Sequence, residues 1–187
     1  MGHKIDFFKV AVRSLKTSGT VAPSSRFLAQ KMLKKINFQT CKVLVELGPG
    51  NGIITKQILK KIQPNSHLVC FEVNDAFYKD LQKINHPQLT VLKVSAEDIQ
   101  TEMQKLGFTN ACHIVSSLPL TIIPNSISNT ILENALKTLQ NNGTFIQYQY
   151  SLTYYKKLKT VFRENISLDF ELLNFPPAFV YRCKKEH

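Results

Sequence analysis

The chain has 187 residues, of which 43% are hydrophobic and 20% are charged, with 24 Lys or Arg against 13 Asp or Glu. This length is typical of one domain, and the hydrophobic share suffices for a buried core, which excludes a mainly disordered chain. No apolar run approaches the roughly 18 residues of a membrane-spanning helix, which argues against an integral membrane protein.

The positive charge is concentrated near the N-terminus. Residues 1–42 hold nine basic residues and one acid, so they carry +8 of the formal net charge of +11. Within them, residues 4–16 have apolar positions every three or four residues between lysines and an arginine, which predicts a basic amphipathic helix. Such a helix can lie on an anionic membrane or pack on the domain, and both alternatives stay open. We expect residues 1–22 to form this helix and a linker, and residues 23–187 to form one domain.

A second helix is expected to begin after Pro23, with a serine as its N-cap. From residue 43 onward, short apolar strands alternate with helices, and the strands are predicted at residues 43–47, 67–72, 89–94, 111–116 and 144–150. This alternation predicts an α/β fold with a doubly wound, mostly parallel sheet.

The last 37 residues have a different pattern. A helix over residues 153–165 precedes two consecutive strands at 168–173 and 178–183. Two consecutive strands predict an antiparallel hairpin at the sheet edge, which makes seven strands in all.

The four cysteines are scattered, with no CxxC pair and no histidine at zinc spacing. Buried thiols in a reducing cytosol fit this spacing better than a disulfide framework. We therefore expect no metal. These cysteines are Cys41, Cys70, Cys112 and Cys183.

The strongest motif is the segment GPGNG at residues 48–52, directly after the strand 43–47. Glycines let the backbone approach a ligand where any Cβ would collide. The spacing differs from the dinucleotide motif GxGxxG, and no Gly-Lys-Ser/Thr of a phosphate-binding P-loop follows. An ordinary tight turn is the alternative.

A carboxylate, Glu72, follows the next strand, 20 residues after Gly52. In an open α/β sheet such a side chain points into the ligand crevice and can accept both hydroxyls of a ribose. A solvated glutamate is the alternative.

Together these features resemble the class I S-adenosylmethionine-dependent methyltransferases. The resemblance implies a Rossmann-like fold, S-adenosyl-L-methionine as cofactor and S-adenosyl-L-homocysteine as product. Relatives often carry Asp where Ser95 aligns, so either Ser95 or Glu97 would contact the adenine. The implied cofactor-binding residues are Glu46, Gly48, Gly50, Gly52, Glu72, Val73, Ser95, Ala96, Glu97 and Ser116.

The segment SLPL at residues 117–120, which we call the acceptor turn, follows the fourth strand. Adenine methyltransferases have an Asn or Asp and an aromatic residue here, and this chain has Ser117 and Leu120 instead. A flipped base would lose a hydrogen bond and a stacking partner, each worth about 1–3 kcal/mol. This counts against an rRNA adenine N6-methyltransferase, which the chain resembles more distantly. That RNA-binding reading remains the alternative, with the basic surface on RNA phosphates.

A narrower resemblance is to the bacterial soluble phospholipid N-methyltransferases, which convert phosphatidylethanolamine towards phosphatidylcholine. It is carried by residues 19–25, 117–120, 145–150 and 173–178. The implied function is N-methylation of the amino headgroup of a phospholipid such as phosphatidylethanolamine at the membrane surface. It implies a cytoplasmic protein that associates peripherally with the inner membrane through residues 4–16. We expect no DNA partner.

The acceptor site is expected beside the transferred methyl group. The apolar segment Leu118-Pro119-Leu120 would desolvate the amine and favour its neutral form, and Tyr150 would orient the headgroup. The candidate catalytic residues are therefore Tyr150, Ser117, Leu118 and Pro119. The lipid phosphate needs donors, for which a helix N-terminus and nearby polar or cationic side chains are candidates. These candidates are Ser24, Ser25, Arg26, Tyr148, Arg163 and Arg182.

Overall fold

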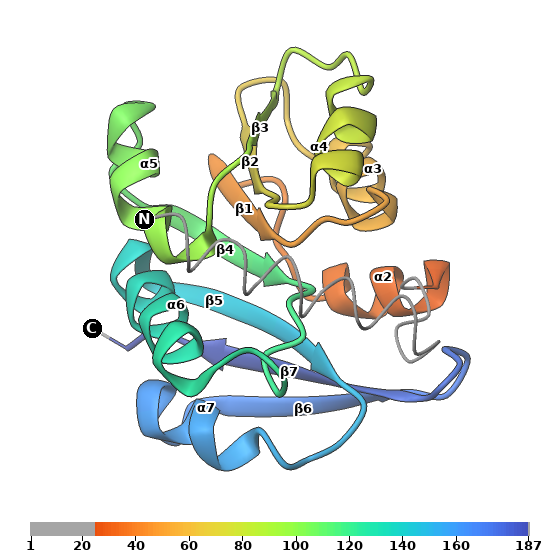
Figure 1. Ribbon diagram of the computed structural model, residues 1–187, viewed down its shortest axis with the longest axis vertical. Coiled ribbons are helices and arrows are strands. Elements are labelled where there is room, and N and C mark those ends of the chain that lie inside the picture. The colour runs from red at the N-terminus through yellow and green to blue at the C-terminus, as the bar shows by residue number, and fades with distance from the viewer. Residues whose placement is uncertain (1–24, 187) are drawn as a thin grey trace.

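The computed structural model describes residues 25–186, and one seven-stranded sheet organises them (Figure 1). The strand order is β3-β2-β1-β4-β5-β7-β6, in which the first five strands along this order are parallel and β7 is antiparallel to both of its neighbours. The predicted doubly wound sheet with a C-terminal antiparallel hairpin is confirmed. The strands are β1 (Val43–Leu47), β2 (His67–Phe71), β3 (Leu89–Leu92), β4 (Ala111–Ser116), β5 (Leu139–Gln149), β6 (Ile166–Glu171) and β7 (Ala178–Lys184).

Helices cover both faces of the sheet, so the parallel strands are buried on each side and have nearly continuous apolar sequences. Helices α2, α3 and α4 pack in one hydrophobic cluster, and η1, α5, α6 and α7 pack in the other. The helices are α2 (Arg26–Leu33), α3 (Ile53–Leu59), α4 (Asp75–Gln82), the 3₁₀ turn η1 (Ala96–Asp98), α5 (Ile99–Lys105), α6 (Asn125–Thr138) and α7 (Tyr155–Phe162).

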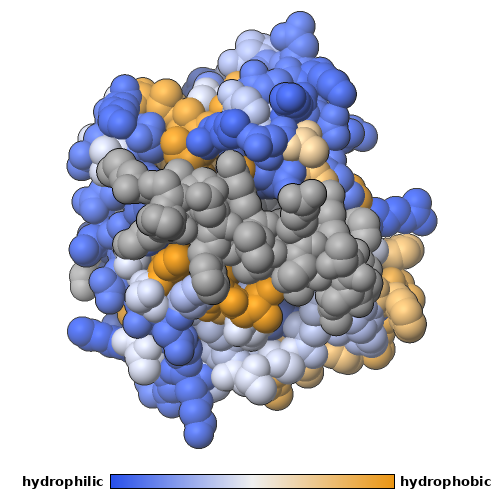
Figure 2. All heavy atoms as spheres, in the orientation of Figure 1, coloured by the Kyte–Doolittle hydropathy of each residue, from blue (hydrophilic) through white to orange (hydrophobic). Residues whose placement is uncertain are grey.

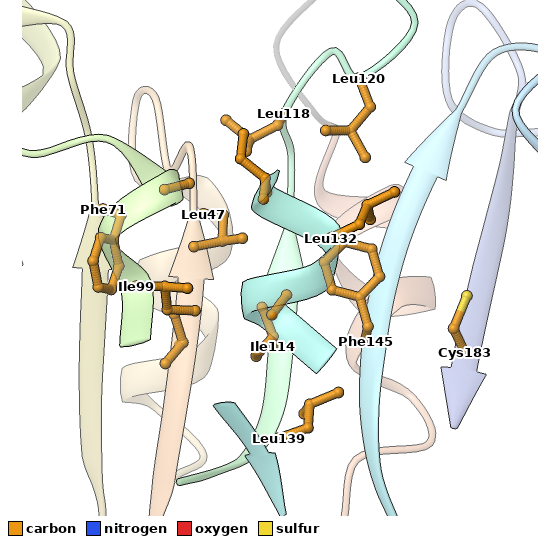
Figure 3. Close-up of a cluster of buried hydrophobic side chains, with 14 of the residues drawn as sticks. Leu47, Phe71, Ile99, Ile114, Leu118, Leu120, Leu132, Leu139, Phe145 and Cys183 are labelled. Atoms are coloured by element: carbon orange, nitrogen blue, oxygen red, sulfur yellow. The ribbon is translucent and has the colours of Figure 1, made fainter. Parts of the chain in front are cut away.

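Alternate residues of each strand supply the two clusters, because successive side chains point to opposite faces. On β1, Val45 and Leu47 enter the cluster under α5 and α6, whereas Leu44 enters the cluster under α2. Figure 3 shows the first cluster, where Leu132 of α6 lies close to Phe145 of β5. The glycine turn and the acceptor turn are thereby anchored to buried strands.

Several element boundaries differ from the sequence prediction. β6 begins and ends two residues earlier than expected, β3 ends two residues earlier, and α7 is shorter than the helix predicted over residues 153–165. The helix expected from residue 97 begins as η1, because the Ser95 hydroxyl caps the Glu97 amide and starts a tighter turn. β5 begins at Leu139 rather than at residue 144, and a register shift follows between Ala111 and His113 of β4. Asn142, with φ 62°, takes up this irregularity inside the strand.

The C-terminal hairpin brings distant segments to one edge of the sheet. β6 and β5 run in the same direction, since both are antiparallel to β7. The turn between β6 and β7, residues 172–177, therefore lies at the edge where the parallel strands end. The predicted N-terminal helix and linker at residues 1–22 lie outside the described residues. No helix within residues 25–186 is long and apolar enough to cross a membrane.

Candidate active site

The loops after β1, β2 and β4 are joined by hydrogen bonds at the carboxyl edge of the sheet. The Gly48 amide donates to the Phe71 carbonyl at 3.0 Å, and the Ser117 amide donates to the Leu47 carbonyl at 2.9 Å. The predicted cofactor residues follow β1, β2 and β3 or end β1 and β4, so the parallel topology brings them to this edge. Open α/β sheets bind ligands in the crevice at this edge.

The glycine turn, residues 48–52, needs glycine for its backbone. Gly48, Gly50 and Gly52 have φ values of 67°, 57° and 74°, in the left-handed region that disfavours side chains. A Cβ on Gly48 would lie 2.7 Å from the Leu118 side chain, so this glycine lets the acceptor turn approach. A Cβ on Gly50 would meet no atom nearer than 4.0 Å, and the backbone there borders open space for a ligand.

Glu72 is buried at the end of β2 and bonds to the glycine turn. Its Oε2 accepts from the Gly50 amide at 3.0 Å, and its Oε1 accepts from the Asn74 amide at 2.7 Å. These bonds fix the orientation of the carboxylate. A carboxylate held in this orientation at the carboxyl end of a strand suits the hydroxyls of a ribose.

Glu46 is fully buried beside the same turn. Its Oε2 accepts from the Thr55 hydroxyl at 2.7 Å, and the Cys70 thiol lies 3.5 Å away. Its Oε1 has no hydrogen-bond partner among the described residues. Burial raises the pKa of the Glu46 carboxyl to about 7. An unpartnered acidic oxygen next to a glycine turn fits a ligand that brings an amino group or positive charge.

Three more predicted cofactor residues, Ser95, Ala96 and Glu97, follow β3, and Val73 follows Glu72 after β2. The Ser95 hydroxyl caps η1 and lies 3.2 Å from Glu97 Oε2. Val73 and Ala96 are nearly buried apolar residues that fit the edge of a flat ring. The Asn134 amide of α6 donates to the Glu97 carbonyl at 2.7 Å and holds η1 in place. No sequence motif indicated Asn134, because α6 meets η1 only in the folded chain.

Side chains of β4 and β5 hold the acceptor turn through hydrogen bonds. The Ser116 hydroxyl accepts from the Leu118 amide at 3.3 Å, and the buried Gln147 amide donates to the Leu118 carbonyl at 3.0 Å. Gln147 was not predicted as a site residue. The signal that could have indicated it is a polar side chain inside a strand that is otherwise apolar and buried. Leu120 is buried in the core with Leu118, and Figure 3 shows both side chains. Leu120 therefore cannot stack on a base.

Tyr150 directly follows β5, and its ring packs edge-on against Tyr148 with centroids 5.7 Å apart. Its hydroxyl is buried and has no hydrogen bond within the described residues, although the Tyr148 and Asn174 side chains are near it. Burial and the adjacent Tyr148 raise the pKa of Tyr150, so this hydroxyl stays protonated at neutral pH. It can donate a hydrogen bond but does not serve as a base.

Two predicted phosphate contacts lie at the start of α2. Ser25 caps the helix by accepting from the Leu28 amide at 3.2 Å, and its own amide donates to Asn174 Oδ1 at 3.1 Å. Arg26 is exposed, with its guanidinium 4.9 Å from the Phe27 ring centroid. Ser24 lies outside the described residues. Asn174 joins this helix start to the loop after β6, and its role was not predicted because 149 residues separate the partners.

The structure does not bring the other two arginines into this group. Arg182 is buried on β7, where it donates to Asp169 Oδ2 at 3.0 Å and to the carbonyls of Met32 and Lys31 at the end of α2. Arg163 follows α7 and precedes β6, at the opposite edge of the sheet. We leave both out of the proposed phosphate contacts, since one holds the fold and the other is remote.

Comparisons with known proteins agree with this geometry. The family model described as ribosomal RNA adenine dimethylase matches residues 24–158. An ornithine lipid N-methyltransferase from Singulisphaera acidiphila is 28% identical over 167 residues, which cover 88% of this chain and 87% of the relative.

Solved structures show the same fold at low sequence identity. A putative O-methyltransferase from Klebsiella pneumoniae has a TM-score of 0.67 at 11% identity, covering 97% of this chain and 90% of that chain. An rRNA methylase from Streptococcus thermophilus has a TM-score of 0.63 at 13% identity, covering 85% of this chain and 94% of that one.

Proposed function

The chain belongs to the ribosomal RNA adenine dimethylase family, within the class I S-adenosylmethionine-dependent methyltransferases. Within this family of methyltransferases, we propose that this chain N-methylates an amino lipid rather than an RNA base. The proposed acceptor is the amino group of a lipid headgroup, of the ornithine lipid or phosphatidylethanolamine kind. The relative from Singulisphaera acidiphila, by its name an ornithine lipid N-methyltransferase, supports a lipid acceptor.

One observation carries the proposal: the acceptor turn is apolar, and its last residue is buried. Leu120 stands where base methyltransferases place a stacking aromatic ring, and it is 1% exposed. Ser117 stands where they place an Asn or Asp. A flipped adenine would find no stacking partner in this turn, whereas a small aliphatic amine needs none.

The residues at the carboxyl edge fit the cofactor. When bound, S-adenosylmethionine supplies a methyl group activated by its sulfonium charge. The fixed carboxylate of Glu72 suits the ribose, and the unpartnered oxygen of Glu46 suits the amino group of the methionine part. Val73 and Ala96 would border the adenine, with Ser95 or Glu97 as its polar contact.

The acceptor amine must lose a proton before it can attack. In water a lipid amine is largely protonated, and an apolar surrounding lowers the pKa of a buried ammonium group. The side chains of Leu118 and Pro119 would provide that surrounding. The protonated Tyr150 hydroxyl would donate to an oxygen of the headgroup, while Tyr148, Ser25 and Arg26 are the proposed contacts for its anionic group.

A second candidate is methylation of an rRNA adenine, which the family name and the net charge of +11 favour. The same basic surface would then contact RNA phosphates. The two candidates share the cofactor site and differ only in the acceptor.

Transfer of labelled methyl groups separates the candidates. Purified protein would receive labelled S-adenosylmethionine with vesicles containing phosphatidylethanolamine, vesicles containing ornithine lipid, or undermethylated rRNA. We expect label in one or both lipids and none in rRNA. Label in rRNA alone would overturn the proposed function.

A further inference from the structure

Large apolar side chains are exposed in three loops at the carboxyl edge of the sheet. The loops are residues 117–124 after β4, 150–154 after β5 and 172–177 after β6. We call their exposed apolar side chains the apolar rim. In Figure 2, pale orange surface marks the right-hand edge, where Figure 1 places the β6–β7 turn. The rim consists of Ile122 (44% exposed), Leu152 (49%), Leu172 (70%), Leu173 (66%) and Phe175 (88%).

The three loops contain no charged residue, although one residue in five of the chain is charged. On the cofactor half of the same edge, which comprises the segments after β1, β2 and β3, charged residues do occur: Glu72 follows β2, Lys93 follows β3, and Glu97 and Asp98 lie in η1. The acceptor half can therefore leave water without desolvating an ion, and the cofactor half cannot. This asymmetry is typical of a surface that enters an apolar phase on one side.

Buried polar contacts hold the β6–β7 turn with its apolar side chains outward. The Asn174 side chain is 2% exposed, accepts from the Ser25 amide and donates to the Pro176 carbonyl at 2.7 Å. Glu171 accepts from the Leu173 amide at 3.0 Å. Since the backbone is fixed by these bonds, the flanking side chains at 172, 173 and 175 cannot turn inward without breaking them.

The loop after β5 is fixed in a similar way. The Tyr181 hydroxyl donates to the Ser151 carbonyl at 3.1 Å, and the hydroxyls of Ser151 and Thr153 lie 2.8 Å apart. Leu152, between them, is exposed. Both loops thus present apolar side chains from a prearranged backbone, which lowers the entropic cost of inserting them elsewhere.

Cations flank the apolar rim. Arg26 is exposed beside the Ser25–Asn174 contact, and Lys156 is exposed in α7, four residues after Leu152. Glu171, the acid next to the β6–β7 turn, is paired with Lys31 at 3.6 Å. An apolar surface bordered by cations complements an anionic lipid bilayer, where each interfacial Lys or Arg contributes about 1 kcal/mol.

We propose that the apolar rim is a membrane-docking surface that inserts Leu172, Leu173 and Phe175 into the interface of an anionic bilayer. Arg26 and Lys156 then contact the lipid phosphates, and the acceptor turn faces the headgroups. This docking is a second contact, separate from the helix predicted at residues 4–16. Its role in bringing substrate to the site rests on the proposed function, but the docking itself does not require methyl transfer.

Vesicle flotation tests the docking surface. The variant L172S/F175S of the full chain should bind vesicles of phosphatidylethanolamine and phosphatidylglycerol about tenfold to a hundredfold more weakly than the wild type, because two exposed apolar side chains are lost. The matched control is L106S/L168S. Leu106 and Leu168 are 37% and 43% exposed but lie at the opposite edge and on the outer strand.

The control variant should bind vesicles like the wild type, and all three proteins should bind S-adenosylmethionine equally. Wild-type vesicle binding by L172S/F175S would overturn the proposal. An equal loss in L106S/L168S would also overturn it, since the effect would then not belong to the rim.

Fluorescence gives an independent measurement, because the chain contains no tryptophan. An indole introduced by F175W should shift its emission to the blue on anionic vesicles and be quenched by lipids brominated on their acyl chains. An indole introduced by L106W should show neither change. Unchanged F175W emission at lipid concentrations where the protein floats would contradict insertion.

A soluble substrate separates this proposal from the proposed function. L172S/F175S should lose methylation of vesicle lipid in proportion to its lost binding and keep wild-type methylation of a monomeric short-chain amino lipid. Rim-dependent flotation without methylation of any lipid by the wild type would sink the proposed function and still support the docking surface.

Discussion

Burial and ligand binding shift the pKa of the Glu46 carboxyl in opposite directions. Its carboxyl is fully buried, with one oxygen unpartnered among the described residues, and its pKa is raised to about 7. A cationic group at this oxygen would stabilise the carboxylate and shift the pKa back down. The free energy that burial of an unpartnered carboxylate costs the cofactor-free protein would therefore be recovered when the cofactor binds.

This gives a prediction for stability against pH. Between pH 4.5 and 7, the folded chain keeps a proton on Glu46 that the unfolded chain releases, so the free energy of unfolding falls as the pH rises through this window. The lost stability is roughly 3 kcal/mol. Glu46→Gln removes this contribution, and the variant should gain about that much relative to wild type between pH 5 and pH 8.

Urea unfolding at several pH values, without cofactor, measures the difference. His113, whose pKa is lowered to about 4 by burial and Arg182, has the opposite pH dependence, but it is common to both proteins and cancels. Cofactor affinity should fall in E46Q despite the gain in stability. A variant that is less stable than wild type at pH 8 by the same amount as at pH 5 contradicts this account.

Gly50 yields a second prediction at the residue scale. Gly50→Val places a branched side chain at φ 57° and in the open space beside the glycine turn. The matched control is Gly107→Val, at φ 80° with no atom within 4 Å of the added Cβ. Both variants should lose at least roughly 1–2 kcal/mol of stability to backbone strain, and only G50V should lose cofactor binding.

Calorimetric titration with S-adenosylmethionine and a thermal melt of each variant would measure the two effects. Equal cofactor affinities in G50V and G107V would show that the cofactor does not lie against the glycine turn.

At the scale of elements, contacts between neighbours in sequence were predictable and contacts between distant elements were not. The place of Glu72 in the site was predictable because it directly follows a strand, and open α/β sheets bind ligands at the carboxyl ends of their strands. The bounds of β1 and β4 match their prediction, since each is a short apolar run between turn residues. Gln147 and Asn174 bond partners 29 and 149 residues away, so only the assembled sheet assigns their roles.

Gln147 yields the prediction at this scale. Gln147→Leu removes the donor that β5 gives to the Leu118 carbonyl, which then keeps only the Leu120 amide among the described residues, at a cost of about 0.5–1.5 kcal/mol. We expect acceptor turnover to fall about tenfold with cofactor affinity unchanged, because the acceptor turn shifts while the glycine turn does not. Gln82→Leu is the control, since Gln82 of α4 also donates to a strand carbonyl, that of Val91, at 3.4 Å.

Steady-state kinetics on a monomeric amino lipid, together with cofactor titration, tests Gln147. Turnover by Q147L that equals turnover by Q82L would remove Gln147 from the positioning of the acceptor turn.

Over the whole molecule, charge and hydropathy divide the carboxyl edge into two halves. Acids gather on the cofactor half, and the three loops of the acceptor half are uncharged and partly apolar. The sequence left the basic residues open to contact with an anionic membrane or with RNA phosphates, because it could not say which surface the charges border. The fold adds that two exposed cations are near the exposed apolar loops. Arg26 follows Ser25, which bonds to Asn174 of the β6–β7 turn, and Lys156 lies four residues after Leu152.

The central claim, an amino lipid as acceptor, is tested most directly by mass spectrometry of the products. Wild-type protein would be incubated with S-adenosylmethionine and a mixture of amino-lipid vesicles and undermethylated rRNA, with G50V as the inactive control. We expect headgroup fragments that gain the mass of one or more methyl groups, with adenines of the rRNA unchanged. Methylated adenine with unmodified lipid would contradict it.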